Sequence, residues 1–304
     1  MNRLIASLLI ALTAPLAAAQ SADRLTVGIT LHPYYSFVAN IVQDRADILP
    51  LIQAGYNPHG YSAQPEDIKR AMDMDVIVMN GIGHDSWADE VLQAAGRDER
   101  DLPRIYANSA VALMPVSGKD QTVNSHTFIS TTAAIAQIYE IAKQLGIYDP
   151  QNADFYRANA REYATNLRRI KAEYMPEIAS IDASNFRAAT MHGAYGYLMQ
   201  EFGLQITAVV EPRHGVEPTA RQLAETVDEI NASGVNILFA ERFFASKLAD
   251  TLEAETNVRI FSFSHISDGE YNADHFEEEM RYNIEELRAA LEYSVAQPLA
   301  QATN

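Results

Sequence analysis

The longest unbroken pattern in the sequence is Gln151–Ile178, 28 residues without a glycine. Its apolar residues recur mainly in steps of three and four, the spacing of one helix face. They are Phe155, Tyr156, Tyr163, Leu167, Ile170, Tyr174 and Ile178. At about 1.5 Å per residue, such a helix would span about 40 Å, more than a small domain needs. The pattern therefore predicts a helix that links two lobes, and we expect Pro176 to kink or end it.

On both sides of this stretch, short apolar segments alternate with amphipathic ones, which indicates strands followed by helices in mostly parallel sheets. The expected strands are Arg24–Leu31, Ala46–Gln53, Val76–Met79, Ile105–Ala107, Arg187–Thr190, Gln205–Val210, Asn236–Phe239 and Arg259–Phe263. The expected helices are Tyr35–Asp44, Pro65–Met72, Asp85–Ala95, Thr131–Leu145, Tyr195–Phe202, Pro218–Ala232, Ser246–Glu255 and Phe276–Tyr293. We expect Gly146 to cap the fourth helix. These patterns predict an α/β fold with an N-terminal lobe (21–150), a linking helix (151–179) and a C-terminal lobe (180–304).

Residues 1–20 have the pattern of a secretory signal peptide. Arg3 precedes an apolar run from Leu4 to about Leu12, and a small-residue cleavage site ends at Ala19. The run is shorter than the ~20 residues that span a bilayer. The sequence contains no cysteine that could carry a lipid. We therefore expect a protein that is free in the periplasm and not lipidated.

The charge balance of the 304 residues argues against nucleic-acid binding. There are 40 acidic and 23 basic residues, a formal net charge of −17, which repels phosphate backbones. The lack of cysteine also excludes thiolate metal sites and thiol catalysis. Any transition-metal chemistry therefore depends on eight histidines and the carboxylates.

Four histidines lie in turns that follow predicted strands or precede a predicted helix: His59, His126, His192 and His265. Ligands of α/β proteins bind beyond the carboxyl ends of the strands. Two of these histidines come from each lobe, so a site between the lobes can use all four. Because neutral imidazole suits zinc, copper, iron and nickel, we predict a metal site there.

The other four histidines have weaker contexts. We expect His84, beyond the strand Val76–Met79, to face the cleft as an auxiliary residue. His32, at the end of the first strand, is expected to support the site or to be structural. His214 and His275 are interpreted as surface residues.

Several motifs resemble the metal-binding solute-binding proteins of ABC importers, the zinc and manganese cluster. The first motif is His59 followed by Gln64-Pro65-Glu66-Asp67. The second, N-G-x-G-x-E-x-W, is matched by Asn80-Gly81-Ile82-Gly83-His84-Asp85-Ser86-Trp87. In this second motif, His84-Asp85 stands where the family often has Leu-Glu. Asn124-Ser125-His126-Thr127-Phe128 stands for N-P-H-x-W, with its proline and tryptophan replaced. The most specific match is His192-Gly193-Ala194-Tyr195-Gly196-Tyr197, for H-x-A-x-x-Y. Glu241-Arg242-Phe243-Phe244 and Tyr282-Asn283-Ile284-Glu285-Glu286-Leu287 match later elements.

The resemblance implies a long rigid backbone helix between the lobes and metal ligands at His59, His126 and His192. Many members place an aspartate in F-T-D-x-I near the last strand. Here the matching stretch is Phe263-Ser264-His265-Ile266-Ser267, so we favour His265 as the fourth ligand, with Asp268 as the alternative.

Three or four imidazoles suit tetrahedral Zn²⁺, whereas Mn²⁺ prefers more oxygen ligands. Zn²⁺ is therefore the expected cargo, and Mn²⁺ or Fe²⁺ are the alternatives. Many zinc-specific relatives carry a long His- and acid-rich loop near the site. The matching stretch here, Met114–Val123, is short and has no histidine.

The expected role is non-enzymatic: a monomer that captures zinc and delivers it to a membrane ABC permease, with a periplasmic metallochaperone as a second candidate partner. Three other roles stay open. A secreted zinc hydrolase would need a general base beside the metal, and neither H-E-x-x-H nor G-x-S-x-G occurs. A surface adhesin on the same fold is the second. A binder of an organic ligand would show an aromatic cleft without converging histidines.

Overall fold

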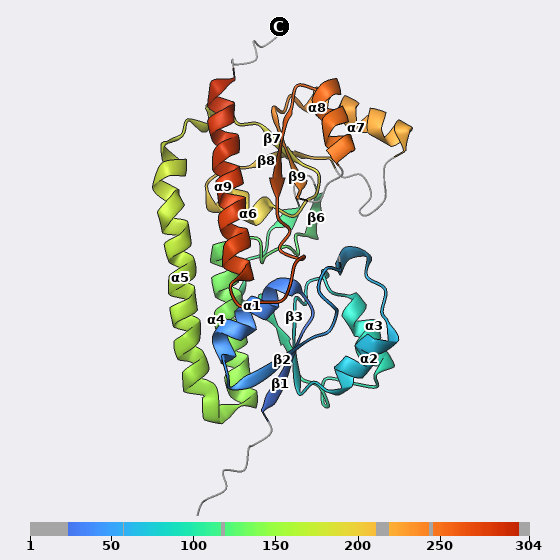
Figure 1. Ribbon diagram of the computed structural model, residues 1–304, viewed down its shortest axis with the longest axis vertical. Coiled ribbons are helices and arrows are strands. Elements are labelled where there is room, and N and C mark those ends of the chain that lie inside the picture. Colours follow the sequence, from blue (N-terminus) through green and yellow to red (C-terminus); the bar gives the residue numbers. More distant parts are fainter. Residues whose placement is uncertain (1–23, 57, 117–118, 211–218, 243–245, 298–304) are drawn as a thin grey trace, which may run out of the picture.

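Two four-stranded parallel sheets, one in each half of an elongated molecule, dominate the fold (Figure 1). The computed structural model describes residues 24–56, 58–116, 119–210, 219–242 and 246–297. The first sheet has the order β2-β1-β3-β4 and the second β10-β9-β7-β8, while β5 and β6 form a small antiparallel hairpin. The strands are β1 (Leu25–Ile29), β2 (Ala46–Pro50), β3 (Val76–Met79), β4 (Arg104–Tyr106), β5 (Pro115–Val116), β6 (Lys119–Val123), β7 (Ala188–Thr190), β8 (Ile206–Val209), β9 (Ile237–Glu241) and β10 (Arg259–Phe263).

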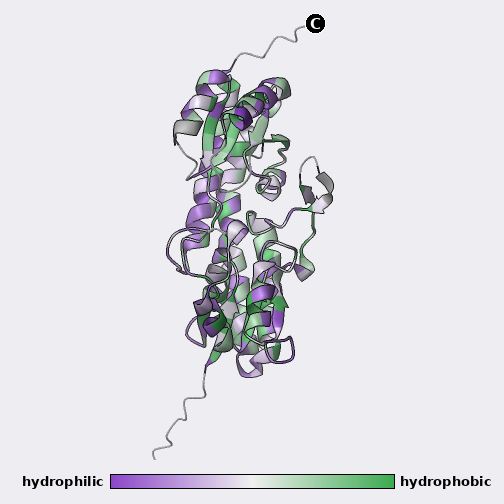
Figure 2. Ribbon diagram, turned by 90° about the vertical axis from the view of Figure 1, so that its right-hand side faces the viewer, coloured by the Kyte–Doolittle hydropathy of each residue, from purple (hydrophilic) through white to green (hydrophobic). Residues whose placement is uncertain are grey.

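Helices cover these sheets, and the expected segments α2 and α8 have the bounds that the sequence predicted. The α-helices are α1 (His32–Val42), α2 (Pro65–Met72), α3 (Trp87–Ala94), α4 (Thr131–Tyr148), α5 (Ala153–Ser180), α6 (Gly196–Glu201), α7 (Ala220–Ser233), α8 (Ser246–Glu255) and α9 (His275–Ala296). Short 3₁₀ turns are η1 (Pro58–Gly60), η2 (Ala107–Ala110), η3 (Pro150–Asn152) and η4 (Ala183–Asn185). Figure 2 shows hydrophobic colour on the strands and mixed colour on the surrounding helices.

Helix α5 runs along both halves, beside α4 and α1 in one half and α9 in the other (Figure 1). Its apolar face is buried as the sequence predicts: Tyr156, Tyr163, Leu167, Ile170 and Ile178. These side chains belong to one core cluster that also contains residues of both parallel sheets. A continuous core of this kind resists relative movement of the halves, because separating them would expose apolar surface.

The expectation that Pro176 ends the long helix is wrong, because α5 continues to Ser180, while the alternative of a kink stays a prediction. Proline removes one backbone hydrogen bond and crowds the preceding turn, but here it is solvent-exposed, where water can satisfy the freed carbonyl. Side chains on both sides of it bind α9: Glu173 to Arg281, Tyr174 to Glu285 and Glu177 to Arg288. These contacts hold the last turns of α5 in place.

Gly146 is not a helix cap either, since α4 continues through it to Tyr148. A Cβ atom at this position would lie 3.0 Å from Cβ of Ala153 and 3.3 Å from its Cα. The glycine therefore permits the close approach of α4 to the first turn of α5, which a local pattern does not reveal.

The predicted signal peptide, residues 1–20, lies outside the described residues. None of the helices that the structure describes is both long and apolar enough to cross a membrane.

Replacing Pro176 by alanine tests the continuity of α5. Pro176→Ala restores a backbone donor at an exposed helix position, so it should raise the free energy of unfolding by up to about 3 kcal/mol. The control Ala172→Gly, one turn earlier and also exposed, should lower it by about 1 kcal/mol. Denaturant unfolding measures both, and an unchanged or lower stability for Pro176→Ala would mean that the helix ends before the proline.

Candidate metal centre

Three neighbouring strands of the second sheet end at one place. His265 lies two residues beyond β10, Glu241 is the last residue of β9, and His192 lies two residues beyond β7. In a parallel sheet these ends share one edge, so the topology gathers residues that are up to 73 positions apart.

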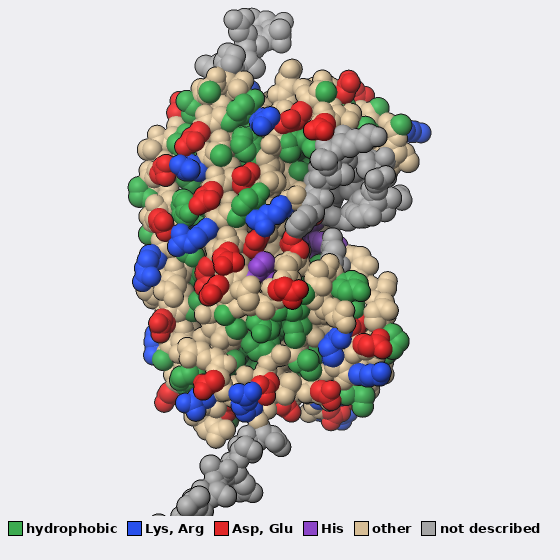
Figure 3. Space-filling model, viewed as in Figure 1, with side chains coloured by type: hydrophobic (Ala, Val, Ile, Leu, Met, Phe, Trp, Pro, Cys, Tyr) green, Lys and Arg blue, Asp and Glu red, His purple; other side chains and the backbone are tan. Residues whose placement is uncertain are grey.

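The first half supplies three more histidines to the same place. His59 lies in η1 after β2, His84 in the turn after β3, and His126 between β6 and α4. The side chains of His84, His126, His192 and His265 are buried, and His59 is partly exposed. Figure 3 shows histidine atoms at the junction between the two halves.

The four predicted ligands form a chain of close contacts through their Nε2 atoms. The Nε2–Nε2 distances are 2.9 Å for His192–His126, 3.1 Å for His126–His59 and 3.4 Å for His59–His265. A neutral imidazole nitrogen either donates or accepts one hydrogen bond. Four nitrogens in a row can therefore satisfy only two of these three contacts by hydrogen bonding.

Asn124 determines which nitrogen of His126 carries the proton. The Asn124 amide donates to the carbonyl of Gly193 (3.0 Å), which identifies its Oδ1 as the acceptor from the backbone N–H of His126 (3.0 Å). Nδ1 of His126 lies 2.9 Å from the same Oδ1, so this nitrogen must be the protonated donor. Nε2 is then the atom with a free lone pair. Burial and the neighbouring histidines hold the pKa of His126 well below its usual value, so the ring is neutral.

The His126 segment also connects the two halves. Besides the bond from Asn124 to Gly193, the Tyr197 hydroxyl donates to the Asn124 carbonyl and accepts from the Met114 N–H, both at 3.0 Å. These bonds join the strand hairpin to the segment after β7 and fix His126 relative to His192.

Glycines shape the turn that presents His84. Gly81 and Gly83 have positive φ angles of 74° and 103°, and a Cβ at Gly81 would lie 2.5 Å from the Tyr106 ring. The buried Asp85 carboxylate accepts from the Asn80 N–H (2.6 Å) and from the Thr30 hydroxyl (2.5 Å). Burial raises the pKa of Asp85. This N-G-x-G turn therefore needs glycine to place His84 beside His59 and His126.

Donor atoms in this cluster fall into two groups that share His265. The donors of His59, His84, His126 and His265 lie within 4.8 Å of one another, and so do those of His192, Glu241 and His265. Glu241 was not predicted as a donor, although its place just beyond the predicted strand Asn236–Phe239 was a usable signal.

Asp268, the alternative fourth ligand, belongs to neither group. Burial, followed by the charge of Glu279, raises the pKa of its carboxylate, while the charges of Arg242 and His275 oppose this rise. The ring of His265, by contrast, has its Nδ1 3.2 Å from the Ser267 hydroxyl and its Nε2 3.4 Å from His59. This placement favours His265 over Asp268.

The remaining histidines lie apart from the Nε2 chain. His275 is not the surface residue that the sequence suggested: only 8% of it is exposed, because it begins α9 against the first half. His32 is buried, stacks on Tyr271 at 4.4 Å and donates through Nε2 to the Gly269 carbonyl. These contacts connect the start of α1 to the segment before α9. His214 lies outside the described residues.

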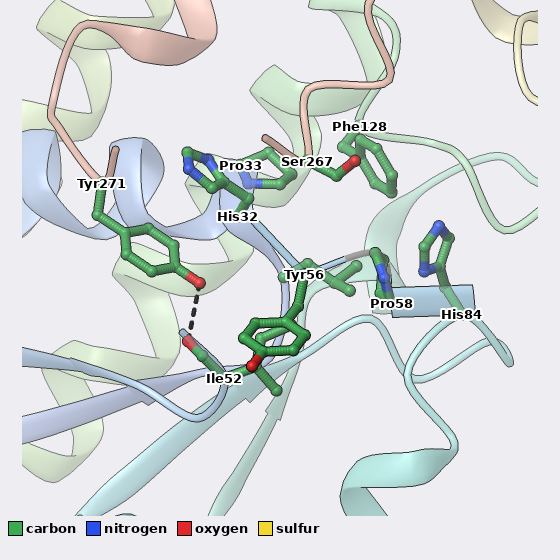
Figure 4. A pocket seen from close by; sticks show the side chains of 10 residues that line it. His32, Pro33, Ile52, Tyr56, Pro58, His84, Phe128, Ser267 and Tyr271 are labelled. Atoms are coloured by element: carbon green, nitrogen blue, oxygen red, sulfur yellow. Dashed lines mark hydrogen bonds between the residues drawn. The ribbon is translucent and has the colours of Figure 1, made fainter. Parts of the chain in front are cut away.

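A small pocket lies beside the cluster and is lined by His84, Phe128, Pro58, His32 and Tyr271, among others (Figure 4). The space that it encloses is far smaller than the ~300–1,000 Å³ of ligand pockets. Histidines converge next to this pocket, whereas a binder of an organic ligand is expected to have an aromatic cleft without converging histidines.

His32 should make stability depend on pH. Burial, then the His275 charge, lowers the pKa of His32 to about 4, although Glu279 opposes this. The fold therefore favours the neutral ring, and this contribution is complete above pH 6.5 and lost as the pH falls toward 4. At 1.36 kcal/mol per pKa unit the loss is about 3 kcal/mol. In chelator-treated protein, His32→Phe should keep the stacking and flatten this part of the stability curve; equal slopes for both proteins would contradict the assignment.

Comparison with known proteins agrees with this geometry. Residues 27–290 match the family model of ZnuA, the periplasmic zinc-uptake complex component A. The solute-binding protein FpvC of Pseudomonas aeruginosa, in complex with Ni²⁺, is 46% identical, with a TM-score of 0.83 over 91% of this chain and all of that one. Its Mn²⁺ complex gives 47% identity and a TM-score of 0.82 over 89% and 99%. The high-affinity zinc uptake protein ZnuA of Bacillus subtilis is 26% identical over 80% of this chain and 79% of that protein.

These matches confirm the predicted fold class and the family resemblance. The relatives are substrate-binding proteins of metal transporters and not enzymes, which confirms the prediction of a non-enzymatic role. Because the family model covers most of the sequence, the chain belongs to the ZnuA family of periplasmic metal-binding, solute-binding proteins that serve ABC importers.

Proposed function

We propose that this protein captures one divalent transition-metal ion between its lobes through His59, His126, His192 and His265 and delivers it to a membrane permease. The observation that carries the proposal is the chain of Nε2 contacts at 2.9, 3.1 and 3.4 Å. Hydrogen bonds can satisfy only two of them, whereas one shared cation accepts all four lone pairs at once.

Zn²⁺ is the ion that this four-imidazole set favours, with Mn²⁺ and Fe²⁺ as the alternatives. With zinc–nitrogen bonds of about 2.0–2.1 Å, the edges of a tetrahedral site are about 3.3–3.4 Å. The His59–His265 contact has this length, and the His126–His59 and His192–His126 contacts are slightly shorter. Mn²⁺ prefers oxygen donors, and Fe²⁺ forms weaker complexes with a given site than Zn²⁺. The Bacillus subtilis relative is named for zinc uptake, while FpvC has been solved with Ni²⁺ and Mn²⁺.

We further propose that the lobes are residues 21–150 and 180–304 and that residues 151–179 link them. The mature protein is then an unlipidated periplasmic monomer, loaded by free zinc or by a metallochaperone. The family relationship and the sequence pattern of residues 1–20 support export. The lack of cysteine supports the absence of a lipid.

Metal titration tests the proposal. Chelator-stripped protein should bind one equivalent of Zn²⁺ more tightly than Mn²⁺ in calorimetry, and the triple variant His59→Ala/His126→Ala/His192→Ala should lose that equivalent. His275→Ala, a buried histidine outside the Nε2 chain, is the matched control and should keep it. Unchanged stoichiometry in the triple variant would overturn the proposed site.

Removing the Asn124 side-chain amide gives an independent test. Asn124→Ala frees the His126 ring to change tautomer, so Zn²⁺ affinity should fall by about 10–100-fold. The control Asn159→Ala removes another buried amide, which donates to the Ile41 carbonyl far from the site, and should lower stability without changing affinity. Equal affinities for the two variants would show that Asn124 does not orient His126.

A further inference from the structure

The cluster contains more donors than a four-coordinate ion needs. The rings of His59, His126 and His265 form a triangle with centroid separations of 5.1, 5.1 and 5.2 Å. His84 contacts all three rings, at 4.4, 4.7 and 5.6 Å. His192 also contacts all three, at 4.9, 4.6 and 5.5 Å. Two further imidazoles thus pack against one shared triangle.

Glu241 adds an oxygen donor beside His192. Its carboxylate lies within 4.8 Å of the donors of His192 and His265, whereas His84 groups with His59, His126 and His265. His84 and Glu241 therefore belong to different donor groups that meet at His265. In an octahedral site with bonds of about 2.1 Å, adjacent donors are about 3.0 Å apart and opposite donors about 4.2 Å apart. Donors within each group lie within 4.8 Å of one another, so the two groups would have to close around one ion at His265 to reach that arrangement.

The position of His84 is built into the structure. The side chain is only 4% exposed, and the glycine turn and Asp85 fix its backbone. Figure 4 shows His84 at one end of the pocket, on the same side as Pro58 and Phe128. A side chain needed only to fill apolar space beside Phe128 would not require an imidazole.

We propose that His84 and Glu241 are the fifth and sixth ligands of this site for ions that adopt octahedral coordination. The proposal rests on the function proposed above and extends the cargo class to Ni²⁺, Co²⁺, Fe²⁺ and Mn²⁺. Zn²⁺ has no geometric preference from its d-electrons and is held by four donors. The Glu241 carboxylate supplies the oxygen that Mn²⁺ favours, and the five imidazoles suit Ni²⁺ and Fe²⁺.

Affinities of single variants test this assignment. His84→Leu and Glu241→Gln should each weaken Ni²⁺ and Mn²⁺ binding by at least the ~10–100-fold that loss of an outer-shell partner costs, and should weaken Zn²⁺ binding much less. The matched controls are His275→Leu, a buried histidine, and Glu286→Gln, a half-buried carboxylate that accepts from the Ser262 N–H. Both should leave all three affinities unchanged.

The visible spectrum of bound Co²⁺ tests the same point in the wild-type protein, where no substitution can disturb folding. Six-coordinate Co²⁺ absorbs weakly and four-coordinate Co²⁺ absorbs strongly. We expect weak bands in the wild type and stronger bands in the double variant His84→Leu/Glu241→Gln. Strong bands in the wild type would overturn the six-ligand assignment, as would equal losses of Ni²⁺ and Zn²⁺ affinity in the single variants. Failure of the proposed function would give a different result: the triple variant His59→Ala/His126→Ala/His192→Ala would still bind zinc.

Discussion

The continuous apolar core along α5 is the constraint on which the site depends. Side chains of this helix pack into a cluster that includes residues from both sheets, so the helix fixes the two sheets relative to each other. The loops after β2 and β3 then meet the loops after β7 and β10, although the chain connects them through long intervening segments. Ligands contributed by flexible lobes would lose affinity to the entropy of ordering them.

Hydrogen bonds position individual histidine side chains within the frame that the core provides. The glycine turn before His84 sets the position of that imidazole, and the Asn124 amide sets the tautomer of His126, so both are ordered before an ion arrives. Such preparation reduces the cost of binding, as in other metal sites whose outer partners orient the ligands. The two donor groups, one of four imidazoles and one that includes the Glu241 carboxylate, meet at His265.

Much of this arrangement could be predicted from sequence because it follows local rules. Strand and helix periodicity gave α2, β3, α8 and β10 with their observed bounds, and turn residues after strands indicated four histidines that the structure brings together. The wrong predictions concern residues whose environment is set by tertiary contacts. Contacts with α9 stabilise α5 beyond Pro176. Gly146 is needed for close packing against Ala153 and does not cap α4. His275 is buried because α9 packs against the first half. Glu241 was missed because its neighbours come from other strands, which one sequence does not pair.

Asn124 has a consequence for release of the ion. The same side-chain amide that keeps the Nδ1 proton on His126 also bonds to the main chain of Gly193 in the other half. The halves cannot move apart at this point without disturbing that amide, and a disturbed amide no longer holds the ring in its binding tautomer. Under the function proposed above, any local displacement that breaks the bond between Asn124 and Gly193 would therefore also lower the affinity of His126 for the ion.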